Sequence, residues 1–335
     1  MKKLVDDRLN DAVNKEQKMP EVVQDAFQNS YSIIRAKAKK KNRKRWMKPV
    51  SVAAACALIA SGLFLSNDAA LAKLQAAFGF KDAGIKLASS NGDTQYNGVI
   101  QENQNVKVTL GNTFADAYRI GLQLYILPTD IDVNDVMDVQ VEFRLNDNTG
   151  KEIAALVSED KIKEPSSPVS EIETKTTHDS DGILTLELLL QSNKHKLPSL
   201  ENSELVIEEI HFSTYKNGII TVDGKWAYSL SPANVQQKSF VANNEVEGLQ
   251  LHEATLSNGS MHVSLTVDEL LDEYVLFDIT LKDQDGAIYT SSGANVSQEE
   301  NQSTVNLVYP YSIWNEQQQI TLSVKGYEDL LLSNK

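Results

Sequence analysis

An abrupt change of solvent preference near residue 49 constrains this chain of 335 residues more than any other feature. Nine Lys or Arg lie within 35–48 with no acidic residue among them, and the next sixteen residues, 50–65, carry no charge. As a helix, those sixteen residues would rise about 24 Å. Flanking uncharged residues extend the stretch to about 20, the length that crosses a hydrocarbon core. The sequence therefore predicts a single transmembrane helix at 49–66.

The flanks of this segment predict its orientation. Trp46 suits the membrane interface, and Lys48 can extend its ammonium toward the headgroups. The basic juxtamembrane flank at 37–48 places the N-terminus in the cytoplasm by the positive-inside rule. We therefore expect a protein of the cell membrane with its C-terminal region, from about residue 68, outside the cytoplasm.

Three other interpretations of the same stretch remain open. A cleaved signal peptide would explain the positive flank, and Ala70-Leu71-Ala72 has the small-x-small pattern of a cleavage site. A buried core helix or a nucleic-acid-binding arm are the others. An uncleaved anchor is favoured because nearly 50 residues precede the apolar run, nine cations adjoin it and no DNA-binding pattern accompanies them. We expect contact with membrane lipid and no direct nucleic-acid binding.

The charge balance divides at the same place. Residues 1–49 carry 14 Lys or Arg against six Asp or Glu, whereas residues 66–335 carry 18 against 40. Such asymmetry indicates two compartments or two partners. The single cysteine, Cys56, lies inside the apolar run, so the external region must be stabilised by its cores and not by disulfides.

The cytoplasmic head at 1–36 is predicted to form short helices with one unburied apolar stripe. Val23, Phe27, Tyr31 and Ile34 recur at helical spacing on that stripe. Thirty-six residues are too few to bury it in a core of their own. We expect a protein partner or self-association to cover it, with the anionic inner leaflet as the alternative.

Beyond the membrane, a short juxtamembrane helix and linker are expected within 68–95, with the helix over 68–87. From about residue 99 the pattern changes to period two, typical of antiparallel strands in a sandwich or barrel. The predicted strands are "NVKVTL" (105–110), "YRIGLQLYI" (118–126), "VQVEFRL" (139–145), "ILTLELLL" (183–190), "ELVIEEIHF" (204–212) and "KWAYSL" (225–230).

An internal repeat suggests two related domains. "VEFRLNDNTGKEI" (141–153) parallels "FDITLKDQDGAIY" (277–289), each a strand, a polar turn ending in Gly and a returning strand. The predicted fold is mainly β, with two tandem antiparallel Ig-like β-sandwich domains at 96–232 and 240–335. Residues 158–182 are predicted to be an exposed loop.

No enzymatic constellation is present in the sequence. The five histidines lack metal-ligand spacing, and His252 and His262 are interpreted as strand-surface residues, although they could meet across a hairpin. The acidic clusters "NDNTG" and "KDQDG" fit turn chemistry better than calcium binding. Trp226 and Trp314 are expected in the core. We predict no catalytic residues, no metal and no cofactor.

The order of parts resembles a group of Gram-positive single-pass membrane proteins with an Ig-like ectodomain of unknown function, often called anti-sigma-factor-like. The residues that carry the resemblance are "MPEVVQDAF" before the anchor, "VKVTLGNTFADAYRIGLQLYI" as the first external hairpin, and "DGKWAYSLSP" at the end of the first β domain. The resemblance implies a head that binds a sigma factor and an ectodomain that senses envelope conditions.

The favoured hypothesis is a membrane-anchored, anti-sigma-factor-like regulator with an unknown extracytoplasmic ligand. The alternative is a cell-envelope binding or adhesion module anchored by its N-terminal helix. It predicts that the head is dispensable.

Overall fold

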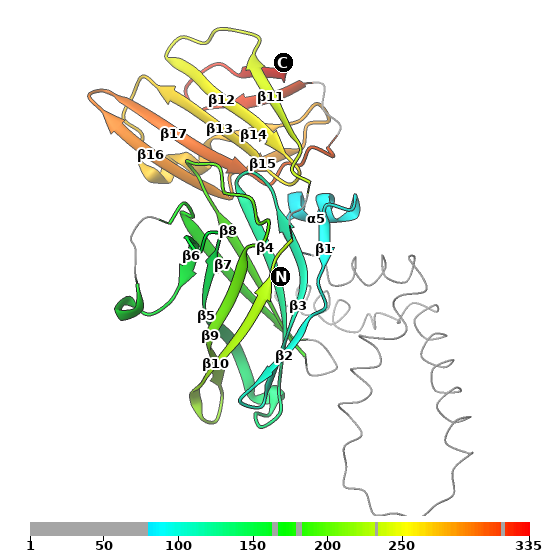
Figure 1. Ribbon diagram of the computed structural model, residues 1–335. Coiled ribbons are helices and arrows are strands. Elements are labelled where there is room, and N and C mark those ends of the chain that lie inside the picture. The colour runs from blue at the N-terminus through cyan, green and yellow to red at the C-terminus, as the bar shows by residue number, and fades with distance from the viewer. Residues whose placement is uncertain (1–79, 163–166, 179–182, 232–233, 316–318) are drawn as a thin grey trace, which may run out of the picture. The chain divides into compact units, whose positions relative to one another are not determined.

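A computed structural model describes residues 80–162, 167–178, 183–231, 234–315 and 319–335 (Figure 1). These residues belong to one compact unit built mainly from antiparallel strands, which confirms the predicted mainly β class. The predicted head (1–36), basic flank (37–48) and membrane helix (49–66) lie outside the described residues. Within the part of the chain that is described, no helix is both long and apolar enough to cross a membrane.

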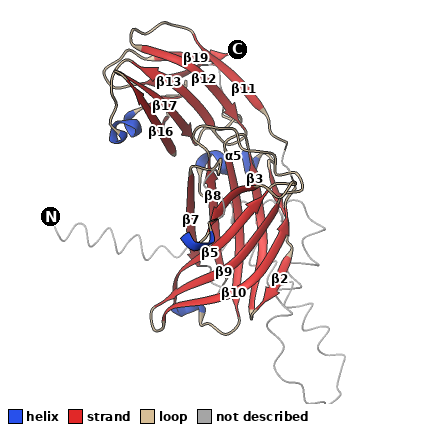
Figure 2. Ribbon diagram, turned by 60° about the vertical axis from the view of Figure 1, so that its left-hand side comes forward, coloured by secondary structure: helices blue, strands red, loops and turns tan. Residues whose placement is uncertain are grey.

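The N-terminal β region (94–230) consists of two sheets. One has the order β1-β3-β4-β8-β7, with β2 also paired to β3, and the other has the order β10-β9-β5-β6. Figure 2 shows β10, β9 and β5 side by side in the second sheet. All six strands predicted here from period-two patterns are strands in the structure. The elements are β1 Thr94–Tyr96, β2 Ile100–Asn103, β3 Val106–Ala115, β4 Arg119–Pro128, η2 Val133–Asp135, β5 Val136–Asn146, β6 Glu152–Leu156, η3 Glu159–Lys161, β7 Glu171–His178, β8 Leu184–Gln191, β9 Glu204–Thr214 and β10 Gly218–Ser229.

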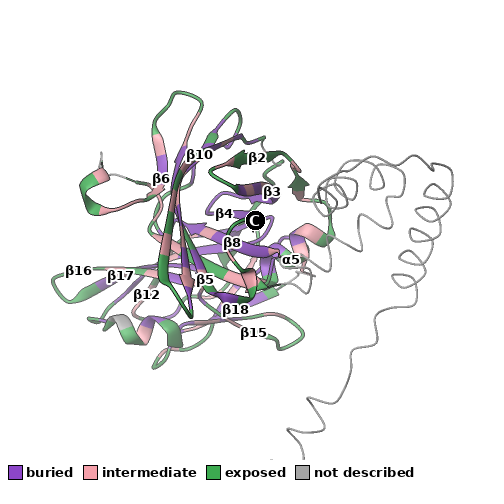
Figure 3. Ribbon diagram, turned by 90° about the horizontal axis from the view of Figure 1, so that it is seen from below, coloured by how far each residue is buried: buried purple, intermediate pink, exposed green. Residues whose placement is uncertain are grey.

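A single hydrophobic core joins these two sheets. Strand β5 contributes alternate residues, including Val139, Val141 and Phe143, because successive side chains of a strand point to opposite faces. Strands β4 and β8 are buried along most of their length (Figure 3). Trp226 is completely buried, as predicted, and its indole N–H donates to the carbonyl of Val106 at 3.1 Å.

Side-chain amides cover the free edge of β10. Asn97, Gln101 and Asn103, in and around β1 and β2, donate to the backbone carbonyls of Ser229, Ala227 and Lys225. The shortest of these bonds, 2.7 Å, is made by Gln101. An edge strand leaves backbone groups unpaired and open to association with another chain, and these amides satisfy three of them.

The prediction of an exposed loop at 158–182 is wrong for Glu171–His178. This segment is strand β7, which pairs along its full length with β8. Its sequence, "EIETKTTH", lacks an apolar alternation because β7 is a largely solvent-exposed edge strand. It is held by the ladder to β8, by Ile172, which packs against the core, and by Thr176, which bonds to Asp138 and Val139 of β5.

The C-terminal β region (237–335) has its own hydrophobic core. Strand β11 divides its pairing between two ladders: Gln237–Ser239 pair with β12, and Phe240–Ala242 pair with β19. The strand order is β15-β14-β18-β19-β11-β12-β13-β17-β16. The elements are β11 Gln237–Ala242, β12 Leu249–Ser257, β13 Met261–Val267, η4 Glu273–Asp278, β14 Thr280–Lys282, β15 Ile288–Thr290, β16 Gly293–Glu299, β17 Gln302–Tyr309, β18 Gln319–Ser323 and β19 Leu330–Asn334.

The two polar turns of the internal repeat have the same geometry. Asp147 and Asp283 each accept two hydrogen bonds from backbone N–H groups of their own turn. Gly150 and Gly286 have φ of 84° and 83°, a left-handed conformation that favours glycine. The strand expected before the second turn is shorter than predicted, because η4 occupies residues up to Asp278.

Helix α5 (Ala83–Ser90) overlaps the end of the juxtamembrane helix expected at 68–87, and residues 68–79 of that prediction lie outside the described residues. Asp82 sets the start, since its carboxylate accepts from the N–H of Ile85 at 2.9 Å. Ile85 packs with Phe80 and Phe114 in a small core. The prediction of a buried Trp314 is wrong: the side chain is 39% exposed and its N–H donates to Asp93.

Candidate functional site at the junction of the two β regions

The partner-binding candidates Val23, Phe27, Tyr31 and Ile34, and the membrane-interface residues Trp46 and Lys48, all lie outside the described residues. A group of buried polar residues, including Asp116, Arg119 and His262, lies instead where the N-terminal and C-terminal β regions meet.

The carboxylate of Asp116 links the two regions. Asp116 lies in the tight turn between β3 and β4, and its Oδ1 accepts from the N–H groups of Tyr118 and Arg119, both at 2.9 Å. Its Oδ2 accepts from Gly259 N–H at 3.1 Å and from the Ser260 hydroxyl at 2.8 Å. Both oxygens are therefore committed, one to each side of the junction.

Arg119 connects helix α5 to the same junction. Its guanidinium is fully buried, donates to the carbonyl of Gly259 at 3.2 Å, and lies 2.6 Å from the carboxylate of Asp82, which caps α5. Burial raises the pKa of Asp116, while the charge of Arg119 and the hydrogen bonds to the carboxylate act in the opposite direction. Asp116 and Arg119 together therefore connect helix α5, the β3–β4 turn and the β12–β13 turn.

An aromatic stack lies beside this ion pair. The rings of Tyr118 and His262 are 4.2 Å apart and nearly parallel. Since His262 Nε2 lies 3.2 Å from the carbonyl of Asn193, Nε2 carries the proton; the buried Nδ1 has no hydrogen-bond partner among the described residues. Tyr118 donates to Glu253 at 3.1 Å. Burial lowers the pKa of His262 despite the opposing charge of Glu253, so the imidazole is neutral near pH 7.

The prediction that His252 and His262 are surface histidines is wrong for His262, which is 1% exposed. The two do not meet across the β12–β13 hairpin. His262 is opposite Thr255, whereas His252 lies at a bulge and contacts Thr266 through its ring nitrogen. Burial of His262 depends on contact with a segment about 70 residues earlier in the chain, which strand periodicity cannot indicate.

A second set of bonds crosses the junction at the C-terminal end of β8. Asn193 donates to the carbonyl of Ala294, and Ser292 donates to the side chain of Gln191. Gly293 allows this approach, because a Cβ there would lie 1.7 Å from the amide nitrogen of Gln191. The backbone of β16 consequently touches the polar end of β8 directly.

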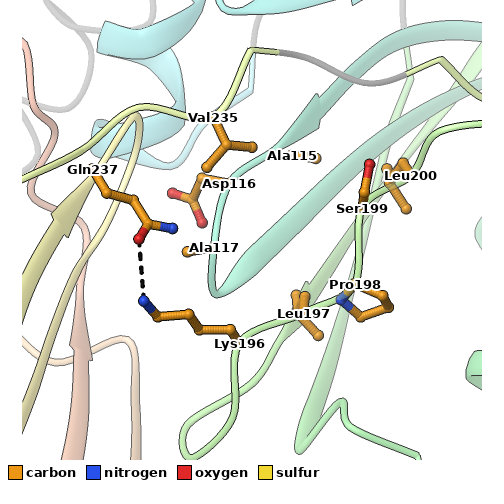
Figure 4. Close-up of a pocket in the computed structure, with 10 residues that line it drawn as sticks. All are labelled: Ala115, Asp116, Ala117, Lys196, Leu197, Pro198, Ser199, Leu200, Val235 and Gln237. Atoms are coloured by element: carbon orange, nitrogen blue, oxygen red, sulfur yellow. Dashed lines mark hydrogen bonds between the residues drawn. The ribbon is translucent and has the colours of Figure 1, made fainter.

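A pocket of about 230 Å³ adjoins the joint (Figure 4). Lys196 lies at its rim and donates to the side chain of Gln237 at 3.1 Å. Asp116 also lines the pocket, but both of its oxygens are already bonded. The remaining lining residues are Ala115, Ala117, Leu197, Pro198, Ser199, Leu200 and Val235. The pocket offers mainly apolar contact and one ammonium group, without an activated nucleophile. The joint is therefore best explained as a structural connection.

A separate polar cluster lies on the face of β5 and β9 away from the core. Glu142 and Glu209 are opposite each other, and their carboxylates, with the His211 imidazole, could hold a cation. The ammonium of Lys161 bonds to both carboxylates. Burial raises the pKa of Glu142. The hydrogen bond from Lys161 and its charge outweigh that effect and hold the pKa below its usual value. Lys161 therefore takes the place that a metal would need, and the cluster is an ion-pair network. Glu209 and His211, two apart on one strand, were the available sequence signal.

No protein-family model and no curated protein matches the chain. Among solved structures, a conserved domain protein from Bacillus anthracis is 14% identical over 72% of this chain and 90% of its own, with a TM-score of 0.44. A DUF4426 family protein from Pseudomonas aeruginosa PAO1 is 13% identical over 41% of this chain and 99% of its own, with a TM-score of 0.23. Neither likeness is close enough to support an argument about this chain.

Proposed function

We propose that the protein is a membrane-anchored, anti-sigma-factor-like regulator. The observation that carries this proposal is the partition of the sequence at residue 49: a cationic head with an apolar stripe, an uncharged stretch of membrane length, and a strongly acidic β-built remainder. In this proposal the head binds a sigma factor through Val23, Phe27, Tyr31 and Ile34, and the external region receives a signal.

The finer architecture belongs to the same proposal. Two Ig-like sandwich domains at 96–232 and 240–335 would explain the two cores and the repeated turns at Asp147 and Asp283. The junction supports a sensing role because its bonds make the two domains move together. A ligand bound to one domain would then affect the whole external region.

Cysteine labelling in intact cells tests the orientation. In a Cys56→Ser background, Ser297→Cys introduces a thiol at an exposed position of β16, and Ser32→Cys introduces one in the head. A membrane-impermeant maleimide should label the first variant on intact cells and the second only after permeabilisation. Equal protection of both positions, or a full-length chain that stays soluble after cell breakage, would contradict the proposal.

A pair of matched substitutions tests the head. Phe27→Asp places a charge on the apolar stripe, whereas Asn29→Asp places the same charge about 200° around the helix. Co-purification of a sigma factor with the full-length protein should fall at least about tenfold for Phe27→Asp and be retained for Asn29→Asp. If wild type retains no sigma factor, or deletion of residues 2–34 leaves function intact, the adhesion alternative is favoured instead.

A further inference from the structure

Four loops of the C-terminal β region converge at one end of its sheets. The loops 268–279 and 243–248 are joined by the bond from Asp268 N–H to the carbonyl of Gly248. Gln302, next to the 299–302 turn, donates to the Asp268 carboxylate at 2.7 Å. Lys325, in the 324–329 turn, lies 4.0 Å from Asp278. We call the surface formed by these four loops the acidic pole.

The acidic pole exposes two aromatic rings on a short 3₁₀ helix. Residues three apart lie on one side of such a helix. Leu276 and Ile279 are accordingly buried in the core, while Tyr274 and Phe277 share another side and are 86% and 56% exposed. Leu270, just before the helix, is 55% exposed. Large apolar side chains gathered on a surface mark binding sites more often than scattered ones do.

Carboxylates dominate the surroundings of these rings. Within the described side chains of the four loops, Lys325 is the sole cation, and its contact with Asp278 is solvent-exposed. One ammonium against the ten exposed carboxylates described in these loops leaves the surface strongly negative. The exposed acidic residues are Glu245, Glu247, Asp268, Glu269, Asp272, Asp278, Glu299, Glu300, Glu328 and Asp329.

We infer that the acidic pole is a docking surface for a cationic amphipathic segment of a protein or peptide. The rings supply apolar contact for the partner's anchors, and the carboxylates attract its Lys and Arg and speed association. A second copy of this surface would be repelled, as would an anionic lipid surface. A simple cation would gain nothing from Tyr274 and Phe277. The inference concerns residues 237–335 alone, so it stands whether or not the head binds a sigma factor.

Binding of a model peptide tests the surface. The probe is a fluorescent helical peptide of about 18 residues with Lys on one face and Leu on the other. It is titrated with the full-length protein in nanodiscs of zwitterionic lipid, and empty nanodiscs supply the background. A Lys/Ser peptide of equal charge and a Glu/Leu peptide of equal apolar face serve as comparisons. We expect saturable binding of the Lys/Leu peptide alone, weakened by salt.

Two double variants of similar chemistry locate the binding. Tyr274→Ser/Phe277→Ser should weaken binding about tenfold or more. Tyr215→Ser/Ile219→Ser removes an equally exposed pair, 74% and 71%, from the β9–β10 hairpin of the other region and should change nothing. Asp268→Asn/Asp272→Asn should weaken binding and reduce its salt dependence. Unchanged melting temperatures would show that each variant is folded.

Several results would overturn the inference. Equal binding of the Lys/Ser peptide would show that charge attraction alone explains the binding. Equal binding of the Glu/Leu peptide would show that apolar contact alone explains it. Equal effects of the two aromatic double variants would show that the binding is not confined to the acidic pole. Absence of binding to the wild-type protein would reject the surface outright.

Discussion

Arg119 is enclosed by three elements that are distant in sequence, and each supplies it with a different partner. The guanidinium is paired with Asp82 before α5, lies near Asp116 in its own turn, and donates to the carbonyl of Gly259. Its Nε has no hydrogen-bond partner among the described residues. A buried ion pair offsets its desolvation only while both partners are present.

We predict that Arg119→Met destabilises the full-length protein by about 3–5 kcal/mol, because the substitution leaves the buried carboxylate of Asp116 and the partly buried carboxylate of Asp82 without their cation. Denaturant unfolding of the protein in detergent measures the change. Lys107→Met is the control: Lys107 is paired with an exposed Glu102 at 3.5 Å, and its loss should cost less than about 1 kcal/mol. Equal losses would show that the Arg119 network does not stabilise the fold.

His262 gives the junction a dependence on pH. Burial lowers its pKa in the folded state, so the unfolded chain takes up the proton first as the pH falls. The stability from the neutral imidazole is therefore complete above pH ~6.5 and declines below it, with a slope of at most about 1.4 kcal/mol per pH unit. The groups facing His262 are Glu253, Lys196 and Tyr118.

Comparison of wild type with His262→Phe isolates this effect from the carboxylates that titrate at lower pH. The free energy of unfolding should fall more steeply for wild type than for His262→Phe between pH 6.5 and 5.5. His178→Gln, which changes an exposed histidine of β7, should keep the wild-type slope. A slope that His262→Phe leaves unaltered would show that the imidazole is not held neutral by the fold.

At the scale of elements, side-chain amides bond to the carbonyls at the free edge of β10, where a neighbouring strand would otherwise supply backbone N–H groups. Gln101→Ala removes the 2.7 Å bond to the carbonyl of Ala227 and leaves that part-buried group unpaired. We expect a loss of about 1 kcal/mol. Glu102→Ala, at the neighbouring and more exposed position of β2, should cost less. Unfolding curves of the two variants decide the matter, and a larger loss for Glu102→Ala would refute the capping role.

The sequence was sufficient for strands whose two faces differ. Strand β5 could be predicted because its alternate residues enter the core, and the Asp147 turn because Asp and Gly have fixed conformational preferences. Strand β7 was missed because neither of its faces is strongly apolar. The short helix η4 was missed because its apolar residues, Val275, Leu276 and Phe277, also suit a strand and lie just before β14.

The junction was not predictable in this way. Asp116 bonds to Gly259 and Ser260, more than 140 residues later, and no periodicity relates such positions. The available signal was local: a charged "DAYR" between two strand-like runs that carry one other charged residue, Lys107. Charges within a buried hairpin need partners, but the sequence does not indicate which segment provides them.

At the scale of the whole molecule, the junction between the two β regions determines whether their two cores unfold together. We predict one calorimetric transition for the two wild-type β regions, because Asp116 connects them through a buried hydrogen bond and Asn193 through a part-buried one. Asp116→Ala/Asn193→Ala should separate it into two transitions. Thr176→Ala removes bonds within the N-terminal β region alone and should lower the melting temperature without separation. Two transitions in wild type would contradict the prediction.

Strand β11 has a mechanical consequence. Its first half pairs with β12 and its second half with β19, and both ladders run along the strand. Tension that enters the C-terminal β region through Gln237 would therefore load two sets of hydrogen bonds in shear at once, and neither set could be peeled off one bond at a time. A pull on this end would reach both halves of the core before any strand came away.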